Sequence, residues 1–326
     1  AYFKQAKSIE QNDKEMLSLY DGITQLYVLT IAQLKENPSY VYIMKNCKEH
    51  VDEIIGLIDE YLQRTEDVKI DDLKASIIPG GANSKKIDIK IVCFHLNNYI
   101  QVHQFANQFI IKEGIVKLIT LMENTRGVTQ AHACDAFASL LEYMNACQYV
   151  EENEELKYPF FNLLCNKTNK VKITENMLKV FIKIGAYFRN QNKPTKFYTF
   201  FYEAAERYSR ENSVPIMQPM VNLINDSYQQ FIFYSIALVT QFINYCKPQK
   251  AEERSQLINI VAELNYGGME KILEKYKENA QVRDYYQKYK EAIKEIINSY
   301  EYQTQIYKNQ IRKYEVKCKL NELPDY

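Results

Sequence analysis

The sequence has no tryptophan and few residues that interrupt helices, with 9 glycines and 8 prolines among 326 residues. Strand-and-turn folds need glycine and proline at their turns, so this scarcity argues against an all-β architecture. Leucine, isoleucine, lysine and glutamate are abundant and favour helices. Hydrophobic residues make up 46% and charged residues 25%, as in a folded protein with a substantial core. We therefore expect an all-α fold.

The chain also lacks net charge, because 41 lysines and arginines are balanced by 41 aspartates and glutamates. A protein without a net positive field is not attracted as a whole to nucleic acid or to an anionic membrane. The longest apolar run, residues 231–239, is too short to cross a bilayer, so we expect no transmembrane segment. The seven cysteines are dispersed and form no CxxC pair, which favours reduced thiols over disulfides or zinc.

Motifs for catalysis are missing as well. The sequence contains no HExxH, P-loop, GxSxG or dinucleotide-binding fingerprint. His95 and His103 are eight residues apart, too far for a metal pair on one helical turn. We therefore expect a protein that is not an enzyme and predict no cofactor and no metal. An unrecognised helical enzyme stays open as an alternative.

Three blocks in the middle of the chain repeat one pattern, which is a short apolar helix, a polar link and a longer helix. The pairs are residues 113–122 with 131–144, 158–165 with 175–188, and 217–224 with 229–246. Matching points recur at roughly 45–55 residues, near the spacing of armadillo and HEAT repeats. No single unit buries its apolar faces alone, so the units are expected to stack. The sequence predicts an armadillo/HEAT-like α-solenoid over residues 86–275.

Different patterns flank this array. Two apolar-periodic segments, residues 15–37 and 40–62, predict a helical domain over residues 1–85. At the other end, apolar residues from Tyr286 to Tyr314 follow alternating steps of three and four. This seam predicts a long helix within residues 276–326, which either pairs with a second copy to form a homodimer or caps the solenoid.

The stretch SLLEYMNACQY, residues 139–149, predicts the end of one amphipathic helix. Asn145 stands there where the pattern would take another hydrophobic residue. Asparagine at such a place is commonly a helix stop. The alternative is that Asn145 is a polar group that points into a binding groove.

Four segments in order resemble the armadillo region of diaphanous-related formins. EYMNACQY resembles a formin segment in which Phe-Met-Asn closes a helix, and MQPMV (residues 217–221) resembles a Phe-Gln-Pro-Leu segment that starts a later repeat. QFIN (residues 241–244) resembles Gln-Leu-Ile-Asn, and the tail with Arg254 and LNYGGMEKIL resembles the family's Arg and Gly-Leu ending. The resemblance covers roughly residues 90–275. Because the chain begins with alanine, we expect a piece of a longer protein, whose proline-rich and actin-binding segments would follow residue 326.

CFHLNNY, residues 93–99, resembles the Leu-Asn-Asn turn of the first formin repeat. In that family this turn and the helical domain before it engage a Rho-type GTPase. The resemblance implies that a Rho-family small GTPase in its GTP state contacts this turn, with residues 1–85 as the other jaw. The predicted GTPase-binding residues are Lys86, Lys90, Phe94, Asn97 and Asn98, of which the lysines form a small basic patch. The alternative for both asparagines is ordinary turn chemistry.

In formins the concave groove of the array also binds the protein's own C-terminal autoregulatory helix. By resemblance, the polar positions of that groove are Asn145, Gln241 and Asn244, whose amides both donate and accept hydrogen bonds. Where the family pattern carries a small alanine, spacing leads to Lys183. A long cation there would crowd an apolar ligand and favour an acidic one, so the ligand of this groove would differ from that of the family.

Together these inferences predict a regulatory region that receives an activated Rho-family GTPase and passes the signal to actin assembly. We expect it in the cytoplasm, associated with the cytoskeleton and recruited to membranes by the GTPase. The alternative is the armadillo scaffold of an engulfment-and-motility protein, whose array ends with a segment comparable to KAEER, residues 250–254.

Overall fold

The computed structural model describes residues 47–71, 89–165, 171–246 and 251–321, and every regular element within these ranges is a helix. The first helices are α4 (Cys47–Asp71), α5 (Ile89–Ile100), α6 (His103–Ile111), α7 (Gly114–Asn124) and α8 (Gly127–Leu140). The next are α9 (Met144–Glu152), the short 3-10 helix η1 (Glu154–Leu156), α10 (Lys157–Cys165), α11 (Val171–Asn190) and α12 (Pro194–Asn212). The last are α13 (Gln218–Ile224), α14 (Gln229–Tyr245), α15 (Ala251–Tyr266), α16 (Met269–Tyr276), α17 (Arg283–Ile297) and α18 (Tyr300–Asn321). The all-α prediction is confirmed.

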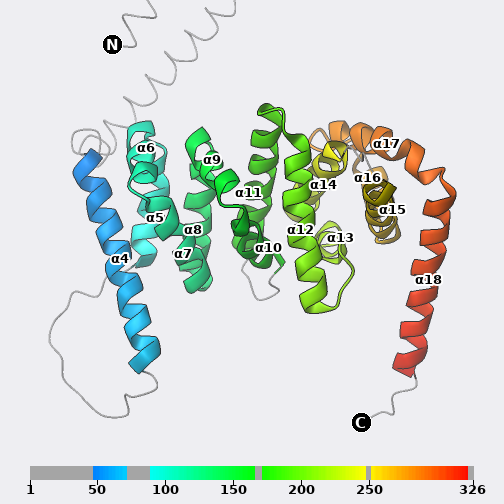
Figure 1. Ribbon diagram of the computed structural model, residues 1–326, viewed down its shortest axis with the longest axis horizontal. Coiled ribbons are helices and arrows are strands. Elements are labelled where there is room, and N and C mark those ends of the chain that lie inside the picture. Colours follow the sequence, from blue (N-terminus) through cyan, green and yellow to red (C-terminus); the bar gives the residue numbers. More distant parts are fainter. Residues whose placement is uncertain (1–46, 72–88, 166–170, 247–250, 322–326) are drawn as a thin grey trace, which may run out of the picture.

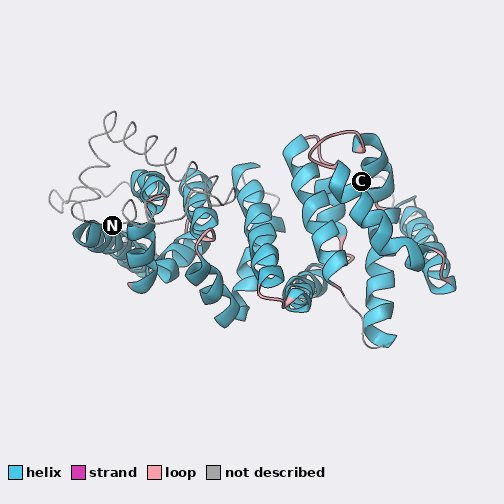
Figure 2. Cartoon of the chain, turned by 90° about the horizontal axis from the view of Figure 1, so that it is seen from above, coloured by secondary structure: helices cyan, strands magenta, loops and turns pink. Residues whose placement is uncertain are grey.

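Groups of three helices form the repeating unit of a solenoid. Within the described part of the chain these groups are α6–α8, α9–α11, α12–α14 and α15–α17, and the last helix of each group packs against the last helix of the next. Helix α5 begins this row, which continues through α8, α11, α14 and α17. Figure 1 shows the groups following one another along the long axis, from α4 at one end to α18 at the other. The view from above in Figure 2 shows the same progression, and the predicted α-solenoid is confirmed.

The core lies between the repeats and is rich in phenylalanine. Phe161 of α10 contacts Phe181 of α11 and Phe201 of α12, with ring centroids 6.1 and 5.4 Å apart. Phe201 in turn lies 5.0 Å from Phe242 of α14, so the same cluster reaches the next repeat. All four rings are buried. Edge-to-face contacts of this kind add to the free energy gained by burying the rings.

The predicted helix over residues 131–144 is shorter than expected, because α8 ends at Leu140 and a new helix, α9, begins at Met144. Between them Tyr143 has extended backbone, and its hydroxyl donates a 2.7 Å hydrogen bond to the carbonyl of Ile100 at the end of α5. This bond holds the chain away from the axis of α8. The prediction that one helix ends at Asn145 is therefore wrong, since Asn145 belongs to the start of α9.

At the N-terminal end of the array, α4 represents the predicted helical domain, while the rest of residues 1–85 lies outside the described residues. Helix α4 packs against α5, α6 and α7. Two ion pairs fix it there. Lys117 of α7 lies 2.7 Å from Asp59, and Lys112, which follows α6, pairs with Asp52.

At the C-terminal end, the predicted apolar seam is divided between α17 and α18. Its first half is mostly covered, because Ile293 is fully buried and Tyr286 and Ile297 are half-buried. Tyr307 and Ile311 on α18 are instead 63% and 56% exposed. Helix α18 is the long C-terminal helix and packs against α15, while homodimer formation stays a prediction.

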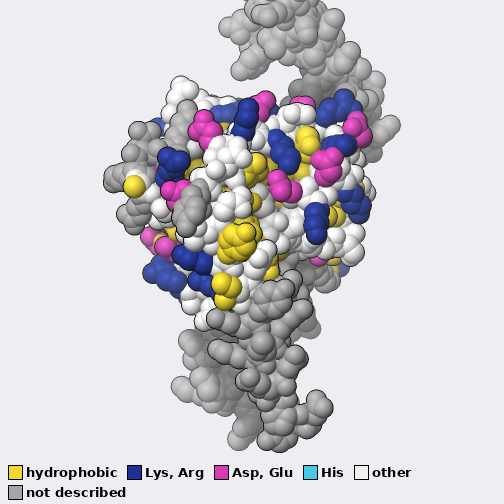
Figure 3. All heavy atoms as spheres, turned by 90° about the vertical axis from the view of Figure 1, so that its right-hand side faces the viewer, with side chains coloured by type: hydrophobic (Ala, Val, Ile, Leu, Met, Phe, Trp, Pro, Cys, Tyr) yellow, Lys and Arg dark blue, Asp and Glu magenta, His cyan; other side chains and the backbone are white. Residues whose placement is uncertain are grey.

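Seen from the α18 end, lysine and arginine alternate with acidic side chains around exposed hydrophobic groups (Figure 3). None of the described helices is long and apolar enough to span a bilayer.

One glycine is required by a close approach between neighbouring helices. A Cβ atom on Gly114, the first residue of α7, would lie 2.6 Å from the buried ring of Phe109 in α6. We predict that Gly114→Ala lowers the free energy of unfolding by about 1–3 kcal/mol, because the ring has to move.

Exposed Gly56 in α4 is the matched control, since a Cβ there meets nothing within 4 Å. Gly56→Ala should raise the free energy of unfolding by about 0.5–1 kcal/mol through helix propensity alone. Urea unfolding followed by circular dichroism measures both values. The same sign of change for the two variants would contradict this account.

Candidate functional site

One face of α5 carries the residues predicted to bind a GTPase. Lys90, Phe94, Asn97 and Asn98 follow helical spacing, so the structure brings them to the same side of this helix. Phe94 leaves 51% of its surface exposed, Lys90 and Asn98 are also exposed, and Asn97 is half-buried. Both asparagines belong to the last turn of α5, where asparagines that end a helix are found, so the alternative of ordinary turn chemistry stays open. Lys86 lies outside the described residues.

Asn97 is bonded to the neighbouring helix of the row. Its Nδ2 donates to Asp135 Oδ2 at 2.9 Å, and its Oδ1 accepts from Ser139 Oγ at 2.8 Å. Both partners belong to α8. An amide that donates to one side chain and accepts from another fixes how two helices are placed against each other. Asn97 therefore has a structural role, and Asn98 is the amide that a partner protein can reach.

Aromatic and apolar side chains surround Phe94 on two helices. Its ring makes edge-on contacts with His95 and with His132 of α8, and the centroids are 5.4 Å apart in each pair. Ile91, one turn earlier, is 51% exposed, and Val128, one turn before His132, is 37% exposed. Exposed apolar groups next to polar ones are typical of protein-binding surfaces. The α5/α8 surface is defined here by Ile91, Phe94, Asn98, Val128 and His132.

Lys183, on α11, contacts the preceding repeat. Its Nζ donates to the carbonyl oxygen of Ala138 at 2.7 Å and forms an ion pair with Glu142 at 3.0 Å. Ala138 lies in the last turn of α8, where backbone carbonyls lack partners within the helix and a cation is stabilised by the helix dipole. This position explains why a lysine stands where the resemblance leads to a small residue.

Gln241, on α14, contacts α11 in a similar way. Its Nε2 lies 3.4 Å from the carbonyl oxygen of Ile182. Gly185 makes room for this contact, because a Cβ at that position would lie 2.8 Å from the amide of Gln241. Gln241 Oε1 is buried and has no hydrogen-bond partner among the described residues.

Asn145 lies apart from the other predicted groove residues. It is exposed on α9, and its Nδ2 donates to Asn107 Oδ1 of α6 at 3.2 Å. Asn244 lies in the last turn of α14 and donates to a carbonyl of its own helix at 2.8 Å. The structure thus brings Lys183, Gln241 and Asn244 to the row of α8, α11 and α14. It places Asn145 instead among the first helices of the repeats.

A further bridge between α8 and α11 was not found from the sequence. Asn176 is fully buried, and its Nδ2 lies 3.4 Å from the carbonyl oxygen of Ala131. Asn176 stands seven residues before Lys183, and Ala131 stands seven residues before Ala138. Two contacts one heptad apart therefore join the same faces of α8 and α11. A polar residue at a core position of a helical pattern was the signal that could have identified Asn176.

Glu151, on α9, is a second residue that the sequence analysis missed. It accepts hydrogen bonds from Lys193 Nζ (2.8 Å), Lys196 Nζ (3.0 Å) and Tyr187 Oη (2.9 Å). These hydrogen bonds, of which the one from Lys193 has the largest effect, lower the pKa of the Glu151 carboxyl to about 2. Burial acts in the opposite direction and raises the pKa. One carboxylate thus holds α9 to the end of α11 and the start of α12.

Cys93 of α5 and Cys147 of α9 are poorly suited to nucleophilic chemistry. Burial raises the pKa of the Cys93 thiol to about 12 and that of Cys147 to about 11, so both are protonated at neutral pH. No group of histidine, cysteine, aspartate and glutamate side chains within the described ranges could hold a metal ion.

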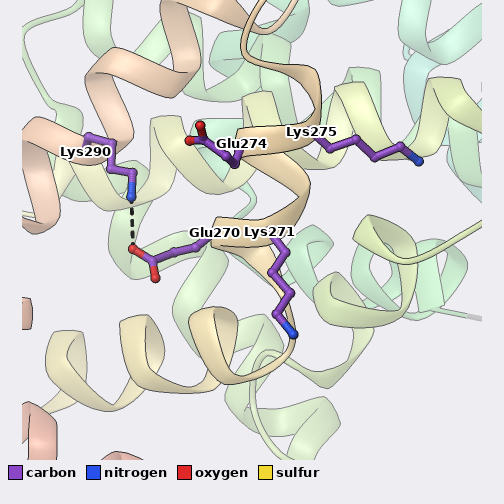
Figure 4. A pocket seen from close by; sticks show the side chains of 5 residues that line it. All are labelled: Glu270, Lys271, Glu274, Lys275 and Lys290. Carbon is purple, nitrogen blue, oxygen red and sulfur yellow. Dashed lines mark hydrogen bonds and ion pairs between the residues drawn. The ribbon is translucent and has the colours of Figure 1, made fainter.

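An open depression between α16 and α17 carries only charged side chains. It is lined by Glu270, Lys271, Glu274, Lys275 and Lys290. An ion pair of 3.1 Å joins Lys290 to Glu270, and the other lysines point away from it (Figure 4). The pair between Lys290 and Glu270 joins α17 to α16 at this shallow depression.

The sequence is similar to those of two formins, although no protein-family model matches the chain. It is 26% identical to Formin-G of Dictyostelium discoideum over 82 residues, which are 25% of this chain and 8% of that protein. It is 20% identical to Formin-C of the same organism over 166 residues, which are 51% of this chain and 14% of that protein. The chain therefore spans a small part of the length of these relatives.

Solved structures with similar arrangements of helices are repeat proteins and engineered proteins. A designed armadillo repeat protein in complex with the peptide (KR)4 matches 89% of this chain and 98% of its own, with 14% identity and a TM-score of 0.46. An engineered protein matches 76% of this chain and 90% of its own, with 13% identity and a TM-score of 0.47. The packing of α5, α8, α11, α14 and α17 shows the helical repeat, and the sequence comparisons add a weak similarity to formins.

The two neighbouring asparagines of α5 should respond differently to the same substitution. Asn97→Asp places a second carboxylate at the position that now donates to Asp135, so we predict a loss of about 1–3 kcal/mol in the free energy of unfolding. Asn98→Asp, at an exposed position, should change it by less than about 0.5 kcal/mol. Chemical denaturation measures both, and the double variant Asn97→Asp/Asp135→Asn should recover most of the loss. Equal effects of the two single substitutions would rule out the bridge.

The Glu151 carboxylate should make stability depend on pH in the acidic range. Because its pKa in the folded protein is about 2, below its ordinary 4.5, its stabilising effect is complete above pH 4.5 and is lost as the pH falls toward 2. We predict that Glu151→Gln lowers the melting temperature at pH 7 and that the difference from the unaltered protein shrinks between pH 4.5 and 2. Glu152→Gln, at the adjacent exposed position, is the control. A difference that stays constant with pH would refute the assignment.

Proposed function

We propose that this chain is the regulatory protein-binding region of a formin-like protein, and that its α5/α8 surface engages a Rho-family GTPase in the GTP state. The observation that carries the proposal is the exposure of Phe94 and Ile91 beside Asn98, on a helix whose sequence resembles the GTPase-binding segment of formins. Similarity to two Dictyostelium formins supports this interpretation over the engulfment-and-motility alternative.

The chemistry of the α5/α8 surface suits a partner that presents an ordered backbone segment. Phe94 offers a large aromatic anchor, the type of residue that contributes most binding energy at interfaces. Asn98 can donate to one backbone group and accept from another. The switch segments of small GTPases are ordered by the γ-phosphate of GTP and released after hydrolysis. A rigid surface of this kind therefore binds the GTP state more tightly than the GDP state.

The signal would then be passed to actin assembly through other parts of the formin. In this proposal the row around α11 and α14 takes up a C-terminal autoregulatory helix, with Gln241 and Asn244 next to its path. The exposed Tyr307 and Ile311 on α18 support homodimer formation. Binding to a membrane-attached GTPase would place a cytoplasmic, cytoskeleton-associated protein at the membrane.

Binding of Rho-family GTPases to the complete chain tests the proposal. Isothermal titration with each GTPase, loaded with a non-hydrolysable GTP analogue or with GDP, should show at least about tenfold tighter binding of the GTP form for one family member. Phe94→Ala should weaken that binding by about tenfold or more, because a central aromatic anchor is removed. Asn98→Asp should weaken it too.

Tyr307→Ala is the matched control, because Tyr307 is a 63% exposed aromatic residue on the opposite end of the array. Its affinity for the GTPase should equal that of the unaltered chain. Asn97→Asp is unsuitable here, since it disturbs the contact between α5 and α8. Equal affinity for both nucleotide states, or full affinity of Phe94→Ala, would disprove the GTPase assignment.

A further inference from the structure

A second exposed apolar area lies on the first helices of two successive repeats. Ile111 at the end of α6 is 68% exposed and Met144 at the start of α9 is 66% exposed, the largest exposed fractions among the large hydrophobic side chains of the described residues. Neither helix belongs to the row that carries the α5/α8 surface. Solvent-exposed hydrophobic side chains that lie close together mark sites that another segment or protein covers.

The hydrogen bond between Asn107 and Asn145 joins the two helices at this area. Ile111 lies one turn beyond Asn107 on the same face of α6, and Met144 directly precedes Asn145. His103 is hydrogen-bonded to Asn107, and Gln148 lies one turn after Met144. The α6/α9 surface is defined by His103, Asn107, Ile111, Met144, Asn145 and Gln148. These six side chains carry no formal charge when histidine is neutral, while charged groups adjoin them, since Glu152 accepts a hydrogen bond from Gln148 and Lys112 pairs with Asp52. An uncharged segment can therefore cover the six side chains and leave the charged groups at the edge in contact with water.

The start of α4 lies near this surface. Lys112, the residue after Ile111, forms an ion pair with Asp52. Asp52 lies in the second turn of α4, which begins at Cys47. The start of α4 is therefore next to the end of α6. The ten residues from 38 to 47 can extend over about 30 Å, which is enough to return any earlier segment to α6 and α9.

The sequence before α4 contains a segment with matching chemistry. Residues 22–34, GITQLYVLTIAQL, carry no charged side chain. Within residues 15–37, apolar side chains recur at helical intervals, at Met16, Leu19, Ile23, Leu26 and Leu34. An apolar stripe of this width has to be covered by another part of the protein or by a partner. The threonine and glutamine side chains beside it can bond to the asparagines of the α6/α9 surface.

We propose that residues 15–37 dock on the α6/α9 surface of their own chain, with the apolar stripe over Ile111 and Met144. The argument for this contact does not use the proposed GTPase binding. It assigns a partner to the exposed side chains of α6 and α9, and it assigns to Asn145 the role of a polar contact within an intramolecular interface.

Hydrogen exchange in the complete chain tests the docking. In the double variant Ile111→Asp/Met144→Asp, amides of residues 15–37 should exchange at least tenfold faster than in the unaltered protein, while α8 and α11 keep their protection. Val171→Asp, a charge placed on a 49% exposed apolar side chain at the start of α11, is the control and should leave residues 15–37 unchanged. Unchanged exchange of residues 15–37 in the double variant would overturn the proposal.

Cross-linking decides the case even if the double variant unfolds. A photoreactive phenylalanine analogue replaces Ile111 in the otherwise unaltered chain, and cross-linked peptides are identified by mass spectrometry. The expected product is an intramolecular link from residue 111 to residues 15–37. A product of twice the chain mass would show that a second copy covers the surface, and the absence of any link to residues 15–37 would equally refute the docking.

Discussion

The arrangement of the repeats depends on polar side chains that cross from one helix of the row to the next. Asn97 joins α5 to α8 through two side chains, Asn176 and Lys183 join α11 to backbone carbonyls of α8, and Gln241 joins α14 to a carbonyl of α11. Each repeat of a solenoid contacts only its neighbours, so errors at one junction are not corrected elsewhere. Apolar side chains resist separation of two helices but tolerate small slides and rotations. A hydrogen bond to one particular carbonyl does not tolerate such slides and rotations, because it weakens steeply with distance and angle. These bridges therefore determine the shape that any partner meets.

The same bridges decide which polar groups remain for binding. Asn97 and Asn98 are adjacent and chemically identical, yet one is used between α5 and α8 and the other faces outward. Lys183 is engaged with the end of α8, so its charge neutralises a helix terminus and Glu142 rather than a ligand. What is left on α5 is an aromatic ring flanked by histidines and an amide, which has the composition of an interface core. Function on this row is thus restricted to the side chains that the packing of the repeats does not use.

Composition and periodicity were sufficient to predict the all-α solenoid, because it follows from the 3.6-residue period of its helices. The common face of Phe94 and Asn98 on α5 was not predicted, since this segment was interpreted as a turn. They could not predict the end of α8, since that break depends on Tyr143 reaching Ile100, 43 positions away. The partner of Lys183 is equally non-local, at a separation of 45 positions. Asn145 is the most instructive case. Local rules offered a helix stop or a groove residue, and the structure shows a third role, as a bridge between α6 and α9.

Helix α4 connects the α5/α8 surface to the α6/α9 surface. It packs against α5, which presents Phe94, and its Asp52 pairs with Lys112 beside Ile111. Docking of residues 15–37 on the α6/α9 surface would restrict the start of α4, and a partner on the α5/α8 surface would restrict the helix against which α4 packs. Two binding events that stabilise the same placement of one helix favour each other, and thermodynamic linkage requires that each strengthens the other by the same factor. The double variant Ile111→Asp/Met144→Asp should therefore weaken GTPase binding, although neither residue belongs to the α5/α8 surface. If docking is lost and the affinity for the GTPase stays unchanged, α4 is rigid enough to isolate the two surfaces.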